Sequence, residues 1–397
     1  MKKLSFFLSL ISLLFIFSFT LKQESMDELI KNRLDRSIRQ YKLMAESLID
    51  QPNKLPQSID ENGNLLTTSS GGWVSGFLPG SLWYLYQYSH DSALLDYARN
   101  YTARIEKEKY NRRTHDLGFM LYGSFGNGYR LTGDTAYRDI LLTGAESLIS
   151  RFNPLIGCIK SWDHGGDRWQ FPVIIDNMMN LEYLFWASKV SGDMKYKDIC
   201  ISHASKTMEN HFRSDYSSYH VVSYDTITGQ VEKKMTHQGY ADESAWARGQ
   251  AWALYGYVMM YRETKDSQYL EQAEHIATFL LNHPNLPADK IPYWDFNAPD
   301  IPDAKRDASA GAIIASALIE LSRYVDADIA KVYLNVAEIQ IRTLSSPAYF
   351  AEKGTNGNFI LKHSVGHLSG NSEVDVPLTY ADYYYIEALL RFSNLPQ

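Results

Sequence analysis

The sequence predicts an all-α protein in which helical hairpins form a closed ring. Three observations lead to this prediction. A unit of helix, short turn containing an aspartate, and second helix recurs along the chain. The first helix of each unit is rich in glycine, alanine and aromatic residues, as a crowded inner layer requires, whereas the second carries more charge. Strand-like runs are few; the best, residues 219–228, predicts a minor β-hairpin in a long loop.

Five hairpins can be placed in chain order. Their first helices are expected near residues 73–88, 115–131, 173–190, 243–263 and 306–323. A helix over 26–50 and another over 376–393 have no partner of their own. If these two meet, they form a sixth hairpin and close a ring of twelve helices. Between the first helix and the first hairpin, residues 51–72 are expected to be polar loop.

Aspartates in the short turns stand where helix N-caps belong. They are Asp91, Asp134, Asp193 and Asp266. A ring places these turns at one end and the long connections at the other. The long connections are 51–72, 110–115, 152–172, 211–242, 284–305 and 347–375. Because loops on a rigid scaffold carry most binding and catalytic residues, the functional site is expected at the long-loop end. Gly76 and Gly80 are expected to let inner helices approach closely there.

Composition restricts the class of protein. The chain has 397 residues, 45% of them hydrophobic, and a net charge of −7 without a basic block, so nucleic acid is not an expected partner. The 28 Tyr, 17 Phe and 8 Trp could supply stacking surfaces for sugar rings. Cys158 and Cys200 could form one bridge or remain as buried thiols, but two cysteines exclude a disulfide framework.

The N-terminus resembles a secretory signal. Lys2 and Lys3 precede a long apolar run, so residues 1–22 are expected to be a signal peptide, or an uncleaved anchor. Residues 23–397 are then expected to form a single domain, periplasmic or secreted. The sequence does not indicate an oligomeric state.

The stretch from Tyr240 to Gly256 carries the most unusual side chains. Arg248 is expected on one helix with Trp246 and Trp252, flanked by both indoles. A buried guanidinium needs an anion, binds carboxylates bidentately and stacks on aromatic faces, which favours a clamp for a flat anionic ligand. The alternative is an amphipathic core helix whose arginine reaches solvent.

Two aspartates are candidate catalytic acids at the starts of inner helices. Asp176 follows Val173, Ile174 and Ile175, so burial should raise its pKa and suit it to general acid catalysis. Asp116 is either a second acid or an N-cap, and Asp295 and Asp307 are expected to be caps. Further polar and stacking candidates lie nearby. They are His115, His220, His237, Gln238, Trp73 and Trp162.

Together these segments resemble the unsaturated glucuronyl hydrolases of glycoside hydrolase family 88. The matching pieces include HDLGF (115–119), IDNMMNLEYLFWA (175–187), HQGYADESAWARGQAWALYG (237–256) and RDASAGAIIASAL (306–318). The resemblance extends over essentially the whole chain after the N-terminal segment. It implies an (α/α)6 barrel, in agreement with the hairpin count.

The resemblance also implies roles for residues that match the family. Asp176 resembles the general acid/base and Asp116 the second essential carboxylate, with His115 beside it. Gln238 and Arg248 resemble the pair that holds the uronate carboxylate. The remaining substrate-binding residues implied are His220, Trp246, Trp252, Trp73 and Trp162. Loop 354–372 falls where the family contacts the next sugar, and neither a metal nor another cofactor is expected.

The implied substrate is an unsaturated uronic-acid oligosaccharide made by a polysaccharide lyase. Protonation at C4, water addition at C5 and opening of the hemiketal would release the terminal 4,5-unsaturated uronic acid. Two alternatives remain at this point: an unsaturated rhamnogalacturonyl hydrolase of pectin breakdown, and a non-catalytic periplasmic glycan-binding protein. The parent polysaccharide, whether chondroitin, hyaluronan, heparin or ulvan, is not determined by the sequence.

Overall fold

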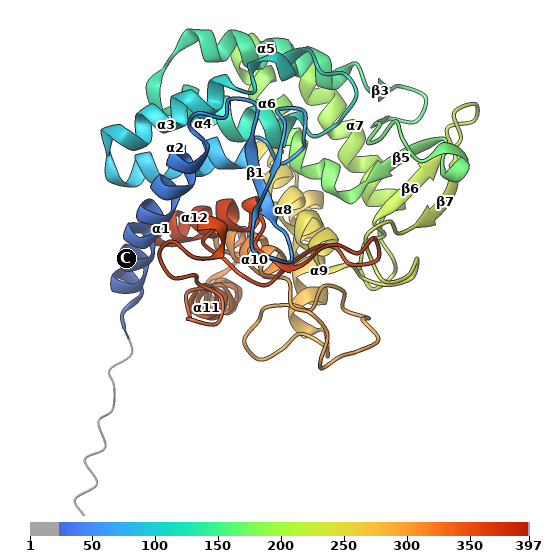
Figure 1. Cartoon of the computed structure of the whole chain (residues 1–397). Helices are drawn as coiled ribbons and strands as arrows, with labels where there is room; N and C mark the ends of the chain where they lie inside the picture. The colour runs from blue at the N-terminus through green and yellow to red at the C-terminus, as the bar shows by residue number, and fades with distance from the viewer. Residues whose placement is uncertain (1–23, 396–397) are drawn as a thin grey trace, which may run out of the picture.

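The structure, a computed structural model, describes residues 24–395 and shows a double ring of helices (Figure 1). The inner helices contact one another in a closed cycle, in which the last, α12, returns to the first, α2. In chain order the inner layer consists of α2 (Phe77–Ser89), η2 with α4 (Gly118–Gly126, Asn127–Thr132), η4 with α6 (Ile175–Asn180, Leu181–Ser191), α8 (Ala247–Thr264), α10 (Ala308–Leu321) and α12 (Thr379–Ser393). The predicted all-α ring is therefore confirmed.

Each inner helix packs against an outer partner. The outer layer consists of α1 (Met26–Leu48), α3 (Ser92–Ala103), α5 (Thr135–Ile149), α7 (Lys195–Asn210), α9 (Ser267–Asn282) and α11 (Ala327–Leu344). The first and last helices, α1 and α12, meet as predicted and complete the sixth hairpin. Every residue of α10 is buried, whereas α3 buries only part of its surface, as inner and outer positions require.

Aspartates cap the second helices at the short turns. Asp91, Asp134 and Asp266 each accept a hydrogen bond from the amide two residues later, at 2.9–3.2 Å. Asp193 makes the same bond to the Lys195 amide at 3.0 Å, although α7 has Met194 as its formal cap. Asp326 caps α11 in a similar way, through Ile329. These bonds satisfy amides that would otherwise lack partners at the helix starts.

Glycine allows the inner helices to approach as closely as predicted. A Cβ on Gly76 would lie 2.1 Å from the Phe119 carbonyl oxygen, and one on Gly80 would lie 2.6 Å from that of Gly123. Both positions therefore exclude any side chain at the crossing of α2 and η2. Residues Gly118–Gly126 form a π-helix, a conformation that often marks functional positions.

The long connections contain more β-structure than the single hairpin that was predicted. β6 (Val221–Tyr224) and β7 (Val231–Met235) form the predicted hairpin, but β5 (Phe171–Ile174) adds a third strand. Three further two-stranded sheets are formed by β1 and β2 (Leu55–Ile59, Leu65–Thr68), β3 and β4 (Phe152–Asn153, Cys158–Ile159), and β8 and β9 (Ser364–His367, Ser372–Val376). The expectations of a polar loop over 51–72 and of a helix beginning at 173 were wrong. A short apolar run such as Phe171–Ile174 has no period that separates strand from buried helix.

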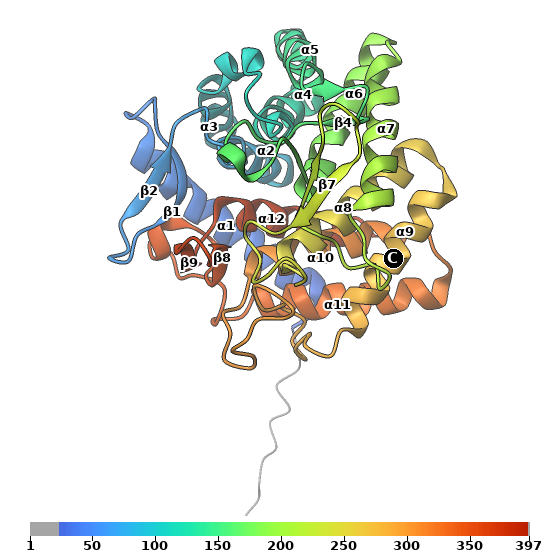
Figure 2. The ribbon, with the colours of Figure 1, turned by 90° about the vertical axis from the view of Figure 1, so that its right-hand side faces the viewer.

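Short 3-10 turns complete the connections at Glu106–Tyr110, Gly166–Arg168 and Asn356–Asn358. Strands β5 to β7 lie together on one face of the ring (Figures 1 and 2). No helix within residues 24–395 combines the length and apolar character needed to cross a membrane. The predicted signal segment, residues 1–22, lies outside the described residues.

The two cysteines are free thiols, so the possible bridge between them is not formed. Both side chains are buried, and burial raises the pKa of Cys158 to about 12. Each thiol therefore behaves as a small apolar core group rather than as a nucleophile.

Candidate active site

The two predicted acids lie at the starts of neighbouring inner helices, at the long-loop end. Asp116 precedes η2 by two residues, and Asp176 lies in the 3-10 turn η4. The Phe119 amide donates a 3.1 Å hydrogen bond to Asn180 and so fastens η2 to η4. Each aspartate side chain is 13% exposed, which leaves it accessible to a ligand at the mouth of the ring.

Burial changes the acidity of Asp176. Desolvation raises its pKa from 3.8 to about 7, with a smaller contribution from the Asp116 carboxylate, while Arg248 opposes the increase. Desolvation has this effect because it disfavours the charged form of an acid. A carboxyl group with a pKa near 7 is protonated in about half of the molecules at neutral pH and can act as a general acid.

His220 faces Asp176 with its proton on the nearer nitrogen. Its Nδ1 accepts bonds from the amides of His237 and Gln238, both at 3.1 Å, so the neutral ring carries its proton on Nε2. That nitrogen lies 3.8 Å from Asp176 Oδ2. Burial lowers the pKa of His220 well below its usual value, which keeps the ring neutral. His220 therefore presents a fixed donor beside the acid.

His115 faces Asp116 with the opposite tautomer. Its Nδ1 lies 2.9 Å from the Ser161 carbonyl oxygen and must donate to it, which leaves a lone pair on Nε2. This Nε2 lies 3.2 Å from Asp116 Oδ1 without forming a hydrogen bond. The 3.2 Å gap leaves no room for an atom between these two acceptors, so a ligand hydroxyl or a water can reach the pair only from the side, where it could donate to either one. The alternative of Asp116 as an N-cap is wrong, because its Oδ2 accepts from the Thr114 hydroxyl and Leu117 precedes η2.

Five of the buried polar atoms without a hydrogen-bond partner belong to the predicted catalytic and substrate-binding residues. They are His115 Nε2, Asp176 Oδ2, His220 Nε2, Trp246 Nε1 and Trp252 Nε1. An unpaired buried donor or acceptor costs on the order of 1–3 kcal/mol, so such groups are rare without a reason. Their clustering around two aspartates indicates a site that is completed by a polar ligand.

Arg248 is buried as predicted, but its anion belongs to the protein. Its guanidinium pairs with the Asp307 carboxylate at 3.2 Å, and both side chains are at most 1% exposed. It stacks over Trp246 at 4.5 Å, whereas its second aromatic neighbour is Tyr380 at 5.3 Å. Trp246 is thus one of the two indoles predicted beside Arg248, although it lies just before α8, which begins at Ala247; the second ring over the guanidinium is that of Tyr380.

Carbonyl oxygens of strand β8 accept hydrogen bonds from both predicted carboxylate-binding side chains, Arg248 and Gln238. Arg248 donates to the carbonyl oxygens of Val365 and Gly366, and Gln238 donates to that of Gly366 at 2.9 Å. One backbone carbonyl is thus shared by the two side chains. Gln238 and Arg248 converge as predicted, on an oxygen from loop 354–372.

The two predicted stacking residues lie at different parts of the site. Trp162 packs edge-on against His220 at 5.8 Å and His237 at 5.2 Å, among the long loops. Trp73 packs at 5.5 Å from Phe119 and 4.9 Å from Tyr380, closer to the inner helices. Both rings are only partly buried and keep surface available to a sugar.

Several supporting residues were not recognised as such from the sequence. Asp307 caps α10 as predicted, through Ser309, but its pairing with Arg248 was missed. Arg168 donates to the Thr236 carbonyl and lies 3.0 Å from His237 Nδ1. Asp295 is not a cap: it binds the Tyr240 amide and the Ser244 hydroxyl. These contacts join segments that lie far apart in the chain, so no local pattern predicts them. The only signal in the sequence was a charged residue beside an apolar run.

Within residues 24–395 no three His, Cys, Asp or Glu side chains come together as a possible metal site. Asp163, in the loop that also carries His164 and Asp167, pairs with Arg151 at 2.9 Å. His203 is buried, and its Nδ1 accepts a hydrogen bond from the Ile159 amide.

Comparison with known proteins identifies the family. The model of Glycosyl Hydrolase Family 88 matches residues 41–392. The chain belongs to glycoside hydrolase family 88. An unsaturated glucuronyl hydrolase of Formosa agariphila is 48% identical over 355 residues, which are 88% of each chain. The family 88 assignment confirms the predicted membership and, with it, a glycosidase of the unsaturated glucuronyl hydrolase type.

Other family 88 members share the fold along nearly their whole length. A solved structure of an unsaturated glucuronyl hydrolase specific for heparin superposes with a TM-score of 0.90 at 51% identity, covering 92% of this chain and 97% of that one. An unsaturated chondroitin disaccharide hydrolase of Streptococcus pneumoniae is 34% identical over 372 residues, 92% of both chains. The (α/α)6 barrel implied by the resemblance agrees with these structures.

Proposed function

We propose that this family 88 enzyme removes the 4,5-unsaturated uronic acid from the non-reducing end of oligosaccharides made by glycosaminoglycan lyases. The names of the similar proteins support this substrate class, since one is specific for heparin and another acts on chondroitin disaccharides. For this chain, the proposal rests on the state of the Asp176 side chain. It has a pKa raised to about 7 and an unpaired Oδ2 among four other unpaired polar atoms.

The proposed reaction uses Asp176 twice. As an acid it gives its proton to C4 of the double bond, and positive charge develops at C5 and the ring oxygen. As a carboxylate it then takes a proton from the water that adds to C5. The C5 hemiketal opens by breaking its bond to the ring oxygen, and the hemiacetal left at C1 releases the next sugar. One water is consumed, and the proton that Asp176 gave is returned.

The surrounding residues would bind and orient the unsaturated ring. The Nε2–H of His220 and the indole N–H groups of Trp246 and Trp252 are donors awaiting acceptors. His115 Nε2 and Asp116 are acceptors for a sugar hydroxyl. Trp73 and Trp162 offer aromatic faces for stacking.

Gln238 and Arg248 would bind the uronate carboxylate. In the structure described, their shared acceptor is the Gly366 carbonyl. A substrate carboxylate at this place would replace that carbonyl, which requires a shift of β8. The exchange is favourable for the guanidinium, because a charged carboxylate binds it more strongly than a neutral carbonyl oxygen does.

The catalytic assignment is tested with Asp176→Asn. The amide cannot supply a proton at neutral pH, so turnover should fall at least about a hundredfold while the fold is kept. The reaction is followed by the loss of ultraviolet absorbance of the conjugated double bond. Asp328→Asn, at a side chain 95% exposed, is the matched control and should retain full activity. Near-normal turnover by Asp176→Asn would overturn the assignment.

The substrate class is tested with unsaturated disaccharides from heparin, chondroitin and hyaluronan lyases, sulfated and unsulfated, beside pectin-lyase products. We propose a preference for heparin-derived disaccharides, supported by the 51% identity to the heparin-specific structure. Faster turnover of pectin-lyase products than of every glycosaminoglycan product would refute this class.

We also propose that residues 1–22 direct export to the periplasm or the medium. Lys2, Lys3 and the apolar run that follows support this. Fractionation of cells that produce the full chain, with mass analysis of its N-terminus, tests it. Recovery of an intact N-terminus in the cytoplasm would contradict it.

A further inference from the structure

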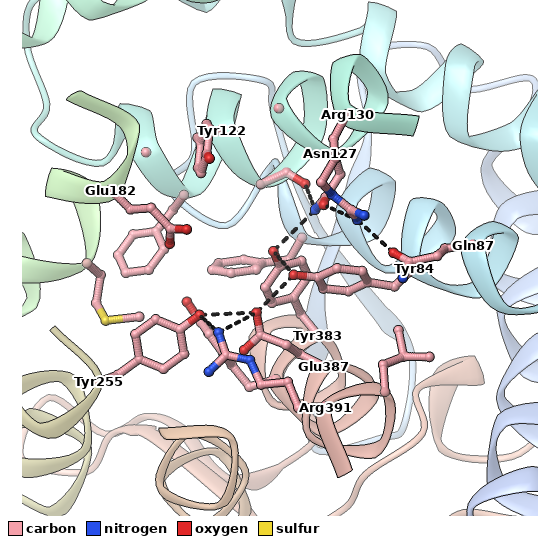
Figure 3. Close-up of a pocket in the computed structure, with 18 of the residues that line it drawn as sticks. Tyr84, Gln87, Tyr122, Asn127, Arg130, Glu182, Tyr255, Tyr383, Glu387 and Arg391 are labelled. Carbon is pink, nitrogen blue, oxygen red and sulfur yellow. Dashed lines mark hydrogen bonds and ion pairs between the residues drawn. The ribbon is translucent and has the colours of Figure 1, made fainter. Parts of the chain in front are cut away.

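A cavity lies at the opposite end of the ring from the candidate active site. It has a volume of about 530 Å³ and is formed where the inner helices end, beside the short turns. Its wall includes residues from α2, η2, α4, α6, α8 and α12, with Arg130 of α4 among them (Figure 3). A cavity of this size is within the range of small-molecule sites. None of the candidate catalytic or substrate-binding residues lines it.

An aromatic layer separates this cavity from the candidate active site. Phe119 and Tyr384 line the cavity and contact Trp252 at ring distances of 5.3 and 5.4 Å. Phe77 also lines it and lies 5.9 Å from Trp73. A molecule in this cavity would therefore be a second ligand and not an extension of the substrate.

One side of the cavity is a completed network of charges. Glu387 accepts bonds from the hydroxyls of Tyr84 and Tyr255, at 2.9 and 3.1 Å, and from Ser316. Arg391 pairs with Glu320 at 2.8 Å and donates to the Tyr255 hydroxyl at 2.7 Å. Because these groups satisfy one another, the network is a rigid wall and does not itself require a ligand.

The other side has polar groups without partners. Tyr384 is 4% exposed, and within residues 24–395 its hydroxyl forms no hydrogen bond. The Tyr122 hydroxyl is likewise unpartnered in the described part of the chain. Glu182 pairs with Arg262 through one oxygen, at 2.6 Å, which leaves the second oxygen available. Figure 3 shows Tyr122 and Glu182 across the cavity from Glu387 and Arg391.

The charges around the cavity nearly cancel. Arg130, Arg323 and Arg391 line it together with Glu182 and Glu387, and Arg262 and Glu320 lie directly behind. Such a wall favours neither a cationic nor an anionic ligand. Aromatic surface is abundant, since Tyr122 and Tyr129 pack around Trp186 at 6.2 and 5.8 Å. Free phenols, one free carboxylate oxygen and aromatic faces suit an uncharged ring that carries several hydroxyls.

We propose that this cavity binds an uncharged pyranose, such as a free hexose or a neutral sugar unit of a glycan. Its hydroxyls would bond to Tyr122, Tyr384 and Glu182, and its apolar face would stack on the aromatic wall. The proposal concerns a site separate from the one that performs hydrolysis, and it holds whether or not Asp176 is the catalytic acid.

Three probes with the same ring test the charge preference. They are glucose, glucosamine with an ammonium at C2, and glucuronate with a carboxylate at C6, each measured by saturation-transfer NMR titration against the full protein. Glucose should bind, and more tightly than glucosamine. Binding of glucosamine without glucose would mean a cation site and would overturn the proposal, as would binding of none of them or glucuronate binding, without glucose binding, that Tyr122→Phe/Tyr384→Phe weakens; glucuronate held at the candidate active site is recognised because that double variant leaves it unchanged.

Isosteric variants locate the bound sugar. The double variant Tyr122→Phe/Tyr384→Phe removes two hydroxyls and keeps both rings, so glucose affinity should fall about tenfold or more. Tyr110→Phe, at a residue 68% exposed and away from the cavity, is the matched control and should bind glucose normally. Asp176→Asn should also bind glucose normally. If the double variant keeps its circular dichroism spectrum and its affinity for glucose, the proposal is wrong.

Discussion

The chemistry of Asp176 follows from its surroundings and not from its type. Desolvation is the main cause of its raised pKa, and the guanidinium of Arg248 limits the increase. Asp328 has the same side chain but is 95% exposed. At the residue scale, burial among apolar neighbours is therefore what makes one carboxyl group a candidate acid.

The pH dependence of turnover should reveal the ionisation of Asp176. Asp176 must be protonated to act on C4, and its pKa is about 7. We expect kcat to fall as the pH rises above about 7, approaching tenfold per pH unit. A pH profile of kcat at saturating substrate measures this, and a kcat that stays constant from pH 6 to 9 would contradict it.

The two carboxylate binders should respond differently to truncation. Arg248→Ala leaves Asp307 buried without its partner, so stability should fall by about 3–5 kcal/mol. Gln238 is only partly buried, so Gln238→Ala should raise KM with little change in stability or kcat. Urea unfolding and steady-state kinetics on both variants provide the comparison. A loss of kcat alone in Gln238→Ala would argue against a role in binding.

At the scale of single elements, every outer helix except α1, which Ser25 caps, is held at its start by an aspartate. The turn aspartates share one geometry, with a carboxylate that accepts the amide two residues later. The repeated sequence unit thus corresponds to a repeated N-capping hydrogen bond. It positions the short-turn end and leaves the opposite end free for long loops.

Removal of one cap should have a modest and measurable cost. Asp134→Ala removes the bond to the Ala136 amide and should lower the apparent free energy of unfolding by about 1 kcal/mol. Asp139→Ala, in the same helix with a side chain 74% exposed, removes an aspartate that caps nothing. It should leave stability unchanged within about 0.5 kcal/mol. Equal losses in both variants would show that charge, and not capping, is responsible.

At the scale of the whole molecule, buried carboxyl groups link stability to pH. Asp382 in α12 accepts the Ile360 and Leu361 amides at 2.8 Å and the Tyr41 hydroxyl at 3.1 Å, and so joins α12 to α1 and to loop 354–372. Burial raises its pKa to about 7, like that of Asp176. Both groups bind more protons in the folded than in the unfolded state between pH 4 and 7. Stability should therefore fall as the pH rises through this window.

The same substitution should have opposite effects at these two positions. Asp176→Asn removes a buried charge whose Oδ2 has no partner, so stability at pH 8 should rise, by up to about 3 kcal/mol. This gain should shrink as the pH is lowered to 5. Asp382→Asn places an amide donor against existing donors and should destabilise the protein at both pH values. Thermal unfolding at pH 5 and 8 checks both, and destabilisation by Asp176→Asn at pH 8 would contradict the linkage.

The sequence by itself determined the ring of hairpins and the capped turns, and it predicted the long-loop end as the place of the site with Asp116 and Asp176 as its acids. These are local patterns, in which period, capping residues and apolar neighbours are written within a few positions. Only the tertiary structure decided that Asp307 neutralises Arg248, that the Gly366 carbonyl joins Gln238 to Arg248, and that Phe171–Ile174 is a strand. Each of these depends on segments more than 45 residues apart, as in the 59-residue separation of Arg248 from Asp307. The pairing of a buried charge is set by whichever segment folds against it, and no local pattern specifies that segment.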